Sequence, residues 1–362
     1  MSEPGSTSTG RRDFLQTLVA APVLGATTLV QTAQAAQAER DVFVKHAYEE
    51  HTVNLGEVVM NYVVSGFATS PALLLIPGQT ESWWGFEKAV ALLSKDFHVH
   101  AVDLRGQGRS TWTPRRYTLD NMGNDLVRFM ALVIKRPVIT SGCSSGGVLS
   151  AWLSAFAMPG QVRGSHYEDP PLFASEYNPL YGHSVRQAAV SSNFEAFAKF
   201  LGDQWSVGDW AGMVASRAAT ARSSAGAQGR GTQGGATPRT GATASSGGTL
   251  QGPPQNLKEY DPEWGRAFVE GTVALSCPHE RMLAQVKVPV LFTHHSRAID
   301  PVTGQLVGAI SDLQATKVKE IVTAAGQSFD YVSLPDAAHA MHQADPARFA
   351  QVLTAWAKKL PA

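Results

Sequence analysis

Short segments with the pattern of strands alternate along this chain with longer segments of helical spacing. The predicted strands lie at 72–76, 98–102, 137–140, 162–167, 288–293 and 329–334, and the one at 72–76 is a continuous apolar run. Runs of this length are typical of strands buried on both faces. The helical segments lie at 84–94, 119–133, 147–156, 311–325 and 346–360. This alternation predicts an α/β fold with a mostly parallel central sheet covered by helices on both faces. β-Branched and aromatic residues recur at alternating positions around Gly56, which predicts two opening strands within 41–66.

The first 38 residues have the pattern of an export signal, and we leave them out of the fold. Arg11 and Arg12 precede a weakly apolar stretch, which small residues of the A-x-A type follow. A paired arginine, a moderate apolar region and such a site are the parts of a twin-arginine signal. Cleavage after Ala35 and after Ala38 fit equally well. We therefore expect a periplasmic or secreted protein without a stable membrane anchor.

The predicted α/β core is divided by an inserted segment. Residues 39–171 and 281–362 would form the core, and residues 172–280 a helical cap over the ends of the strands. Within the cap, residues 217–254 consist almost entirely of Ala, Gly, Ser, Thr, Gln, Pro and Arg. Such a composition buries too little apolar surface to offset the entropy lost on ordering the backbone. We therefore expect a disordered surface excursion there.

Composition and charge exclude several classes of protein. The 362 residues carry 30 Lys and Arg against 30 Asp and Glu, so no broad basic field is available to bind nucleic acid. Two cysteines cannot build a disulfide framework, and no Cys/His spacing is typical of a zinc site. We expect a soluble enzyme that acts on a small molecule, with no cofactor and no metal. A homo-oligomer is compatible with the sequence.

The clearest chemical motif is Gly142-x-Ser144-x-Gly146, which follows a predicted strand and precedes a predicted helix. This is the pattern of a nucleophile elbow, in which a serine lies on a strained turn between the two elements. Glycines flank the serine because larger side chains would clash in that turn. We therefore expect Ser144 to be a catalytic nucleophile.

A serine nucleophile needs a base, and the base needs an acid to orient it. His339 follows the last predicted strand and fits the order Ser…acid…His, whereas His342 would support the loop. Two carboxylates are candidates for the acid: Glu168 ends one strand, and Asp300 follows the next. Either could orient His339. Asp300 and Asp169 could instead cap turns before prolines.

Backbone N–H groups near Ser144 would form the oxyanion hole. One donor would be the N–H of Ser145, directly after the nucleophile. The other would be the N–H of Gly78 or Gln79, in the loop that follows the run at 72–76.

Aromatic side chains predict an apolar substrate. Trp83 and Trp84 lie beside the oxyanion loop, and the cap supplies Trp205 and Trp210 among other aromatic residues. Large aromatic side chains are typical of sites that bind apolar ligands. Few charged residues in this region could bind a phosphate or a carboxylate, so we expect an apolar, aromatic ester or lactone.

Several motifs together resemble the α/β-hydrolase superfamily. They are the DLRGQGRS segment at 103–110, the elbow at Ser144, and the His339-x-x-His342 loop with the Asp-Pro pair at 345–346. The resemblance covers the chain from about residue 41 onward, apart from the insertion. It implies an α/β-hydrolase fold with an inserted cap and a triad of serine, acid and histidine.

A narrower resemblance is to zearalenone lactone hydrolases. It lies in the segment 142–147 and in the spacing from Ser144 to Glu168, which is 168 − 144 = 24 positions. It implies a triad of Ser144, Glu168 and His339. The chain departs from the fungal members at residues 77–78, where it has Pro-Gly and they have Asp-Gly.

The sequence thus predicts a serine hydrolase that cleaves a carboxylic ester or lactone through an acyl-enzyme, and the narrower resemblance implies a zearalenone-like macrolactone. A C–C bond hydrolase or a cofactor-free haloperoxidase would use the same triad. A ligand-binding receptor is the non-enzyme alternative on the same fold. A serine at the nucleophile position argues against haloalkane dehalogenase and epoxide hydrolase chemistry, which uses an aspartate there.

Overall fold

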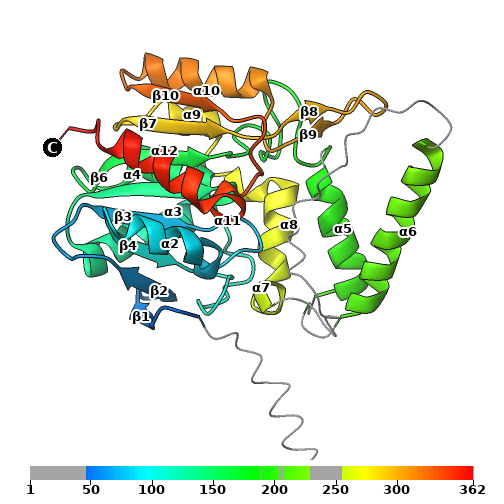
Figure 1. Cartoon of the computed structure of the whole chain (residues 1–362), viewed down its shortest axis with the longest axis horizontal. Coiled ribbons are helices and arrows are strands. Elements are labelled where there is room, and N and C mark those ends of the chain that lie inside the picture. The colour runs from blue at the N-terminus through cyan, green and yellow to red at the C-terminus, as the bar shows by residue number, and fades with distance from the viewer. Residues whose placement is uncertain (1–45, 188, 204, 206–207, 229–254, 362) are drawn as a thin grey trace, which may run out of the picture. The chain divides into compact units, whose positions relative to one another are not determined.

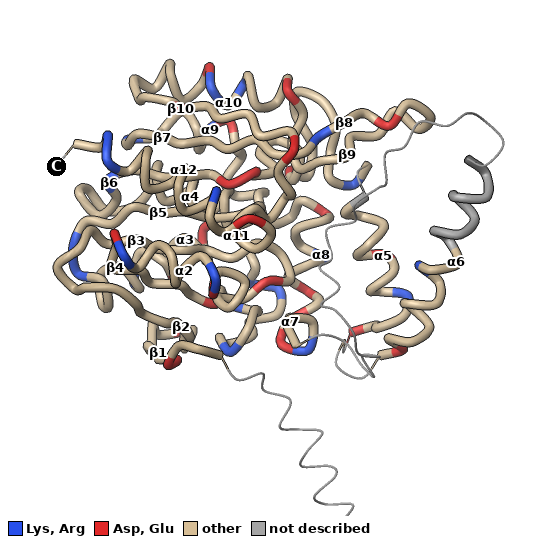
Figure 2. The backbone as a smooth tube through the Cα atoms, viewed as in Figure 1, with Lys and Arg blue, Asp and Glu red and all other residues tan. Residues whose placement is uncertain are grey.

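The computed structural model describes residues 46–361, apart from residues 188, 204, 206–207 and 229–254. The export signal expected at 1–38 lies outside the described residues and stays a prediction, as does any disorder at 229–254. Among the helices that the structure describes, none combines the length and apolar character needed to cross a membrane. Lys and Arg are interspersed with Asp and Glu along the described backbone (Figure 2).

A mostly parallel eight-stranded sheet lies at the centre of the fold (Figure 1). In chain order its strands are β1 (Glu50–Asn54), β2 (Val59–Ser65), β3 (Ala72–Ile76), β4 (His98–Val102), β5 (Val138–Cys143), β6 (Val162–Glu168), β7 (Val290–His294) and β10 (Phe329–Ser333). Their order across the sheet is β1-β2-β4-β3-β5-β6-β7-β10. The β1–β2 and β2–β4 pairs are antiparallel, and the other pairs are parallel. The predicted fold class is confirmed.

Strand β3 shows why a continuous apolar run marks this sheet. Leu73 and Leu75 belong to one buried core cluster, whereas Leu74 and Ile76 belong to the other. Successive side chains of a strand point to opposite faces, so a strand covered on both sides needs an apolar residue at every position. The predicted strands at 72–76 and 98–102 are confirmed residue for residue.

Helices cover both faces of the sheet (Figure 1). One face carries η1 (Trp83–Phe86), α2 (Glu87–Leu93), α11 (Met341–Ala344) and α12 (Pro346–Ala357). The other carries α3 (Leu119–Phe129), which continues into η2 (Met130–Ile134), with α4 (Ser145–Phe156), α9 (His279–Leu283) and α10 (Asp312–Ala324). These helices match the predicted helical segments, with two exceptions: α9 crosses the predicted end of the cap at residue 280, and the short α11 precedes the predicted segment at 346–360.

Further helices lie between β6 and β7. They are α5 (Ala189–Leu201), α6 (Trp210–Gln228), α7 (Gln255–Lys258), α8 (Pro262–Glu270) and η4 (Thr272–Ala274). Because α6 runs to Gln228, the prediction of disorder is wrong for residues 217–228. Alanine, the strongest helix former, is concentrated in that part, and an average over the whole segment conceals it.

A small hairpin was not predicted from the sequence. It consists of β8 (Ala298–Ile299) and β9 (Leu306–Val307), which pair antiparallel after β7. Strands of two residues are too short to produce a detectable alternation of apolar and polar positions.

Helices α3 and α4 meet at Gly123. Helix propensity favours alanine over glycine at this position, whereas the packing between the two helices favours glycine. A Cβ on Gly123 would lie 2.2 Å from the ring of Trp152. That ring is buried, and its Nε1 donates to Asp120 Oδ1 at 3.0 Å, so it has little freedom to move aside. Alanine is better than glycine in a helix by about 1 kcal/mol, but overpacking a core costs about 1–3 kcal/mol.

We predict that Gly123→Ala lowers the free energy of unfolding by about 1 kcal/mol, because the clash with Trp152 outweighs the gain in helix propensity. Urea denaturation of both proteins measures this difference. The control is Asn124→Ala in the same helix, where the side chain is exposed and the substitution brings no clash. A more stable Gly123→Ala protein would contradict the packing of α3 against α4.

Candidate active site

Ser144 lies between the end of β5 and the start of α4, on a turn with unusual backbone angles. Its φ is 54° and its ψ is −120°, a region that strains any residue with a side chain. The N–H of Ser144 donates to the carbonyl of Glu168 at 2.8 Å, which ties the turn to the end of β6. Ser144 is half-buried, whereas its neighbours Cys143 and Ser145 are buried, so it is the more accessible residue of this tight strand-to-helix turn. This is the geometry of a nucleophile elbow.

The glycines of the motif are explained by backbone contacts. A Cβ on Gly142 would lie 2.0 Å from the carbonyl oxygen of Gly146. A Cβ on Gly146 would lie 2.4 Å from the carbonyl oxygen of Ile76, at the end of β3. Because these neighbours are backbone atoms, no side-chain movement could make room for a larger residue.

His339 lies in the loop between β10 and α11, and it pairs with Asp169. Its Nδ1 is 2.6 Å from Asp169 Oδ2, while its side chain remains 45% exposed. Asp169 is buried and also accepts the N–H of His295 at 3.1 Å. A carboxylate on Nδ1 holds the ring in the tautomer whose Nε2 can accept a proton. His339 therefore combines an oriented ring with access to solvent.

The electrostatics of this pair favour an ionised carboxylate. Burial raises the pKa of Asp169, but the hydrogen bond and charge of His339, with a further contribution from His295, outweigh burial and lower it. Burial lowers the pKa of His339, but the hydrogen bond to Asp169 and its charge outweigh burial and raise it. The pair therefore stabilises a positive imidazolium opposite a negative carboxylate.

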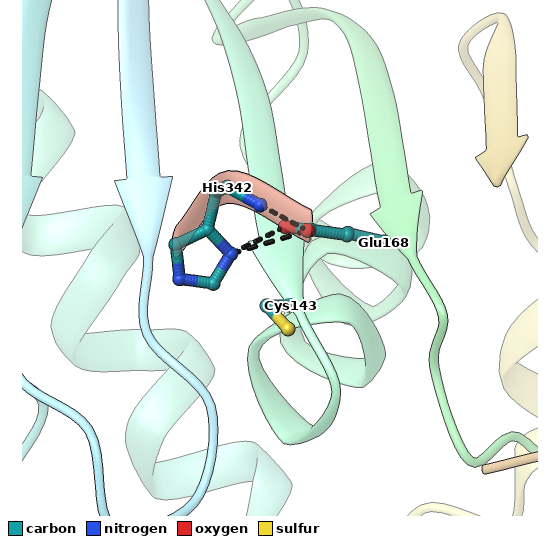
Figure 3. A group of neighbouring side chains, drawn as sticks. All are labelled: Cys143, Glu168 and His342. Carbon is teal, nitrogen blue, oxygen red and sulfur yellow. Dashed lines mark hydrogen bonds and ion pairs between the residues drawn. The ribbon is translucent and has the colours of Figure 1, made fainter. Parts of the chain in front are cut away.

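Glu168 contacts a different histidine, so the prediction that it orients His339 is wrong. Its Oε2 lies 2.9 Å from Nδ1 of His342, and its Oε1 accepts the backbone N–H of His342 at 3.0 Å (Figure 3). Both side chains are fully buried. Glu168 is the last residue of β6, and Asp169 follows it with a φ of 44°, so the chain leaves the extended conformation between the two side chains. The two carboxylates therefore reach two different histidines.

Asp300 lies in the loop between β8 and β9 and is not paired with His339. Its Oδ1 accepts the N–H groups of Val302 at 2.9 Å and Thr303 at 2.7 Å. These backbone bonds lower the pKa of Asp300. The prediction of Asp300 as the alternative acid is wrong, and its expected role in capping a turn is confirmed.

The oxyanion loop follows β3 and packs against the nucleophile. A Cβ on Gly78 would lie 3.2 Å from Cβ of Ser144. The N–H of Gly78 donates to Glu81 Oε2 at 2.9 Å, so it is already bound and the prediction that it serves the oxyanion is not supported. Two predicted donors remain, the N–H of Gln79 and that of Ser145. Ser145 is the first residue of α4, where an N–H has no acceptor within its own helix.

The tryptophans beside the oxyanion loop have different surroundings. Trp83 is fully buried in the core, where its Nε1 donates to Glu50 Oε1 at 2.7 Å and its N–H to Asp103 Oδ1 at 2.8 Å. The prediction that Trp83 binds substrate is therefore wrong, because its whole surface is used for packing. Trp84 is half-buried and stacks on His46, with ring centroids 4.4 Å apart.

The cap reaches the oxyanion loop through an aromatic pair. Trp205 is buried and stacks on Tyr260 with ring centroids 5.1 Å apart, and the hydroxyl of Tyr260 donates to Gln79 Oε1. Asn256 Nδ2 donates to the carbonyl of Thr80 at 2.7 Å. Trp205 is thus close to the site through Tyr260, a residue that the sequence marks only as one of many cap aromatics. Trp210, at the start of α6, packs partly buried against the same core cluster.

Cys143, Glu168 and His342 are buried together, with candidate ligand atoms all within 4.8 Å of one another (Figure 3). The hydrogen bonds between Glu168 and His342 already use the carboxylate and Nδ1. Burial raises the pKa of the Cys143 thiol, and a protonated thiol is a poor metal ligand. A hydrogen-bonded pair beside a packed thiol therefore explains the group better than a metal site does. Cys143 is buried and is not part of a disulfide.

Comparison with known proteins agrees with this architecture. Residues 71–192 match the family model of the alpha/beta hydrolase fold. The chain is 28% identical over 105 residues to 3-oxoadipate enol-lactonase 2 of Acinetobacter baylyi and 29% identical over 104 residues to epoxide hydrolase 4 of Homo sapiens. Each match covers 28% of this chain, and the matched stretches span only 39% and 28% of those relatives.

A solved structure extends the likeness across the fold. The enol-lactonase from Burkholderia xenovorans superposes with a TM-score of 0.55 at 16% identity, over 85% of this chain and 100% of that one. Sheet order, elbow and family model therefore define a protein with the α/β-hydrolase fold.

We predict that Asp169→Asn lowers the pKa of the His339 ring, because burial then acts without the opposing carboxylate. Histidine-labelled protein titrated by NMR measures this pKa. Asp300→Asn is the control and should leave the pKa of His339 unchanged. A larger shift of the His339 pKa in Glu168→Gln than in Asp169→Asn would contradict the pairing.

Proposed function

We propose that this protein is a serine hydrolase that cleaves a carboxylic ester or lactone of an apolar substrate through an acyl-enzyme. The observation that carries the proposal is a strained, accessible Ser144 combined with an exposed His339 on a buried Asp169. The two parts are neighbours: Cys143 Sγ is 3.8 Å from the carbonyl of His339, and the N–H of Ser144 binds the carbonyl of the residue before Asp169.

Each residue would have one role in this chemistry. Nε2 of His339 takes the proton of Ser144 as the hydroxyl oxygen attacks the acyl carbon. The N–H groups of Gln79 and Ser145 stabilise the oxyanion, and Asp169 stabilises the imidazolium. The imidazolium then gives its proton to the leaving alkoxide as the acyl C–O bond breaks. Water, activated by His339, hydrolyses the acyl-enzyme and releases the acid.

The cap supports an apolar substrate. Trp205 and Tyr260 stack on each other and are buried behind Gln79, so apolar side chains back the loop where the acyl oxygen would bind. The name of the Acinetobacter relative, an enol-lactonase, is compatible with a lactone. A zearalenone-like macrolactone is the narrowest form of the proposal. The resemblance to zearalenone lactone hydrolases implied that Glu168 pairs with His339, but Glu168 contacts His342. The zearalenone-like form of the proposal is therefore supported only by the segment 142–147 and by the cap.

We predict that wild-type protein forms a covalent fluorophosphonate adduct on Ser144 and that Ser144→Ala forms none. The adduct requires an activated serine beside a base, which a ligand receptor would not need. Intact-protein and peptide mass spectrometry locate the adduct. Wild-type protein should also add one water to members of a panel of aryl esters and lactones that includes zearalenone. Absence of both the adduct and hydrolysis would overturn the proposal.

We predict that Asp169→Asn lowers kcat by about 10⁴-fold, because the histidine would lose its productive tautomer and its counter-charge. Steady-state kinetics on the best ester of the panel measure this loss. Asp300→Asn is the matched control, an Asp-to-Asn change in a loop outside the site, and should keep wild-type kcat. If Asp300→Asn removes activity and Asp169→Asn does not, the proposed acid is wrong.

A further inference from the structure

A second carboxylate–histidine pair lies behind the proposed triad and reaches the oxyanion loop. Glu81 accepts the N–H of Gly78 on Oε2 at 2.9 Å and Gln343 Nε2 on Oε1 at 2.9 Å. Its side chain is only 16% exposed. One carboxylate therefore connects the oxyanion loop to the start of the histidine-bearing segment α11.

His342 lies between Glu81 and Glu168. Its Nδ1 and backbone N–H bind Glu168, while its Nε2 is 3.7 Å from Glu81 Oε2 and has no hydrogen-bond partner among the described residues. Phe86 stacks on the ring at a centroid distance of 4.0 Å, and Phe349 contacts its edge at 5.8 Å. The ring is thus held in place with each nitrogen turned towards a carboxylate.

The charges around His342 favour its cationic form. Burial lowers the pKa of His342, but Glu168 on β6 and Glu81 on the oxyanion loop outweigh burial and raise it, while His339 opposes them weakly. A cation at this position compensates two buried carboxylates, either of which would be destabilising if left unpaired. Glu81 is thereby retained next to Gly78.

The peptides on the two sides of Gly78 are both held. Glu81 Oε2 accepts the N–H of Gly78, which belongs to the Pro77–Gly78 peptide. Gln107 Nε2 donates to the carbonyl of Gly78 at 2.6 Å, and this carbonyl belongs to the Gly78–Gln79 peptide. In a planar trans peptide the carbonyl of Gly78 and the N–H of Gln79 point in opposite directions. Holding the carbonyl towards Gln107 therefore fixes the direction of the Gln79 N–H, one of the two donors assigned to the oxyanion.

We infer that Glu81 and His342 are positioning residues that set the oxyanion loop: His342 bridges Glu168 and Glu81, and Glu81 holds the N–H of Gly78 so that the adjoining Gly78–Gln79 peptide keeps its place beside Ser144. This inference rests on the proposed function, because it concerns the same site. Neither residue touches the substrate. Their effect is on the direction of one backbone N–H group.

The test compares Glu81→Ala and Glu81→Gln with wild type on the best ester of the panel. Loss of one oxyanion donor lowers kcat by about 10²–10³-fold, so we expect about a 100-fold loss for Glu81→Ala with little change in KM. Glu81→Gln keeps an acceptor for the N–H of Gly78 and should recover much of this loss. Glu87→Gln is the matched control, because Glu87, the first residue of α2, accepts the N–H of Ala47 and binds neither Gly78 nor His342.

The split between kcat and KM separates positioning from a general loss of structure. Two results for Glu81→Ala would overturn the inference while leaving the proposed function intact. One is an unchanged kcat, and the other is a raised KM with a kcat within about threefold of wild type. If Glu81→Ala does not fold, Glu81→Asp decides, because its shorter side chain keeps the charge but withdraws the acceptor from the N–H of Gly78: a kcat below wild type at unchanged KM supports positioning, and an unaltered kcat contradicts it. A wild-type protein that neither hydrolyses the panel nor forms the Ser144 adduct overturns the proposed function instead.

Discussion

The strained backbone at Ser144 is the constraint on which the rest of the site depends. A positive φ at a residue with a side chain costs about 1–3 kcal/mol and persists only where its surroundings enforce it. Here Gly142 and Gly146 allow β5, α4 and the end of β3 to approach within backbone contact, and the carbonyl of Glu168 binds the N–H of Ser144. The central strands thereby present the serine at their carboxyl ends, where the loops that carry the other groups converge.

Two carboxylate–histidine pairs arise from two consecutive residues at that edge. Asp169 holds the partly exposed His339, whereas Glu168 holds the fully buried His342. The first pair has the access that proton transfer to a substrate requires. The second has none, but it is joined through Glu81 to the loop that carries Gln79, one of the two proposed oxyanion donors. Exposure, more than residue type, separates the chemical role from the supporting one.

The parts of the fold that could be predicted are those with a local cause. The strand at 72–76 follows from an unbroken apolar run, and the elbow from glycines whose spacing is imposed by backbone contact. Trp83 shows the limit of such reasoning, because its position beside the oxyanion loop suggests a ligand contact while its side chain belongs to the core. Residues 217–228 show a second limit: they are helical, but the composition averaged over 38 positions predicted disorder because it hides an alanine-rich end.

By itself the sequence determined the α/β architecture, the nucleophile elbow and the position of the histidine loop after the last strand, because periodicity and short motifs specify local geometry. It did not determine which carboxylate meets which histidine. Glu168 and Asp169 differ by one position, and the contact each makes depends on the direction of its side chain at the end of β6 and on the arrangement of a loop 170 residues away. That choice belongs to the tertiary structure, because it depends on side-chain direction and burial and not on spacing.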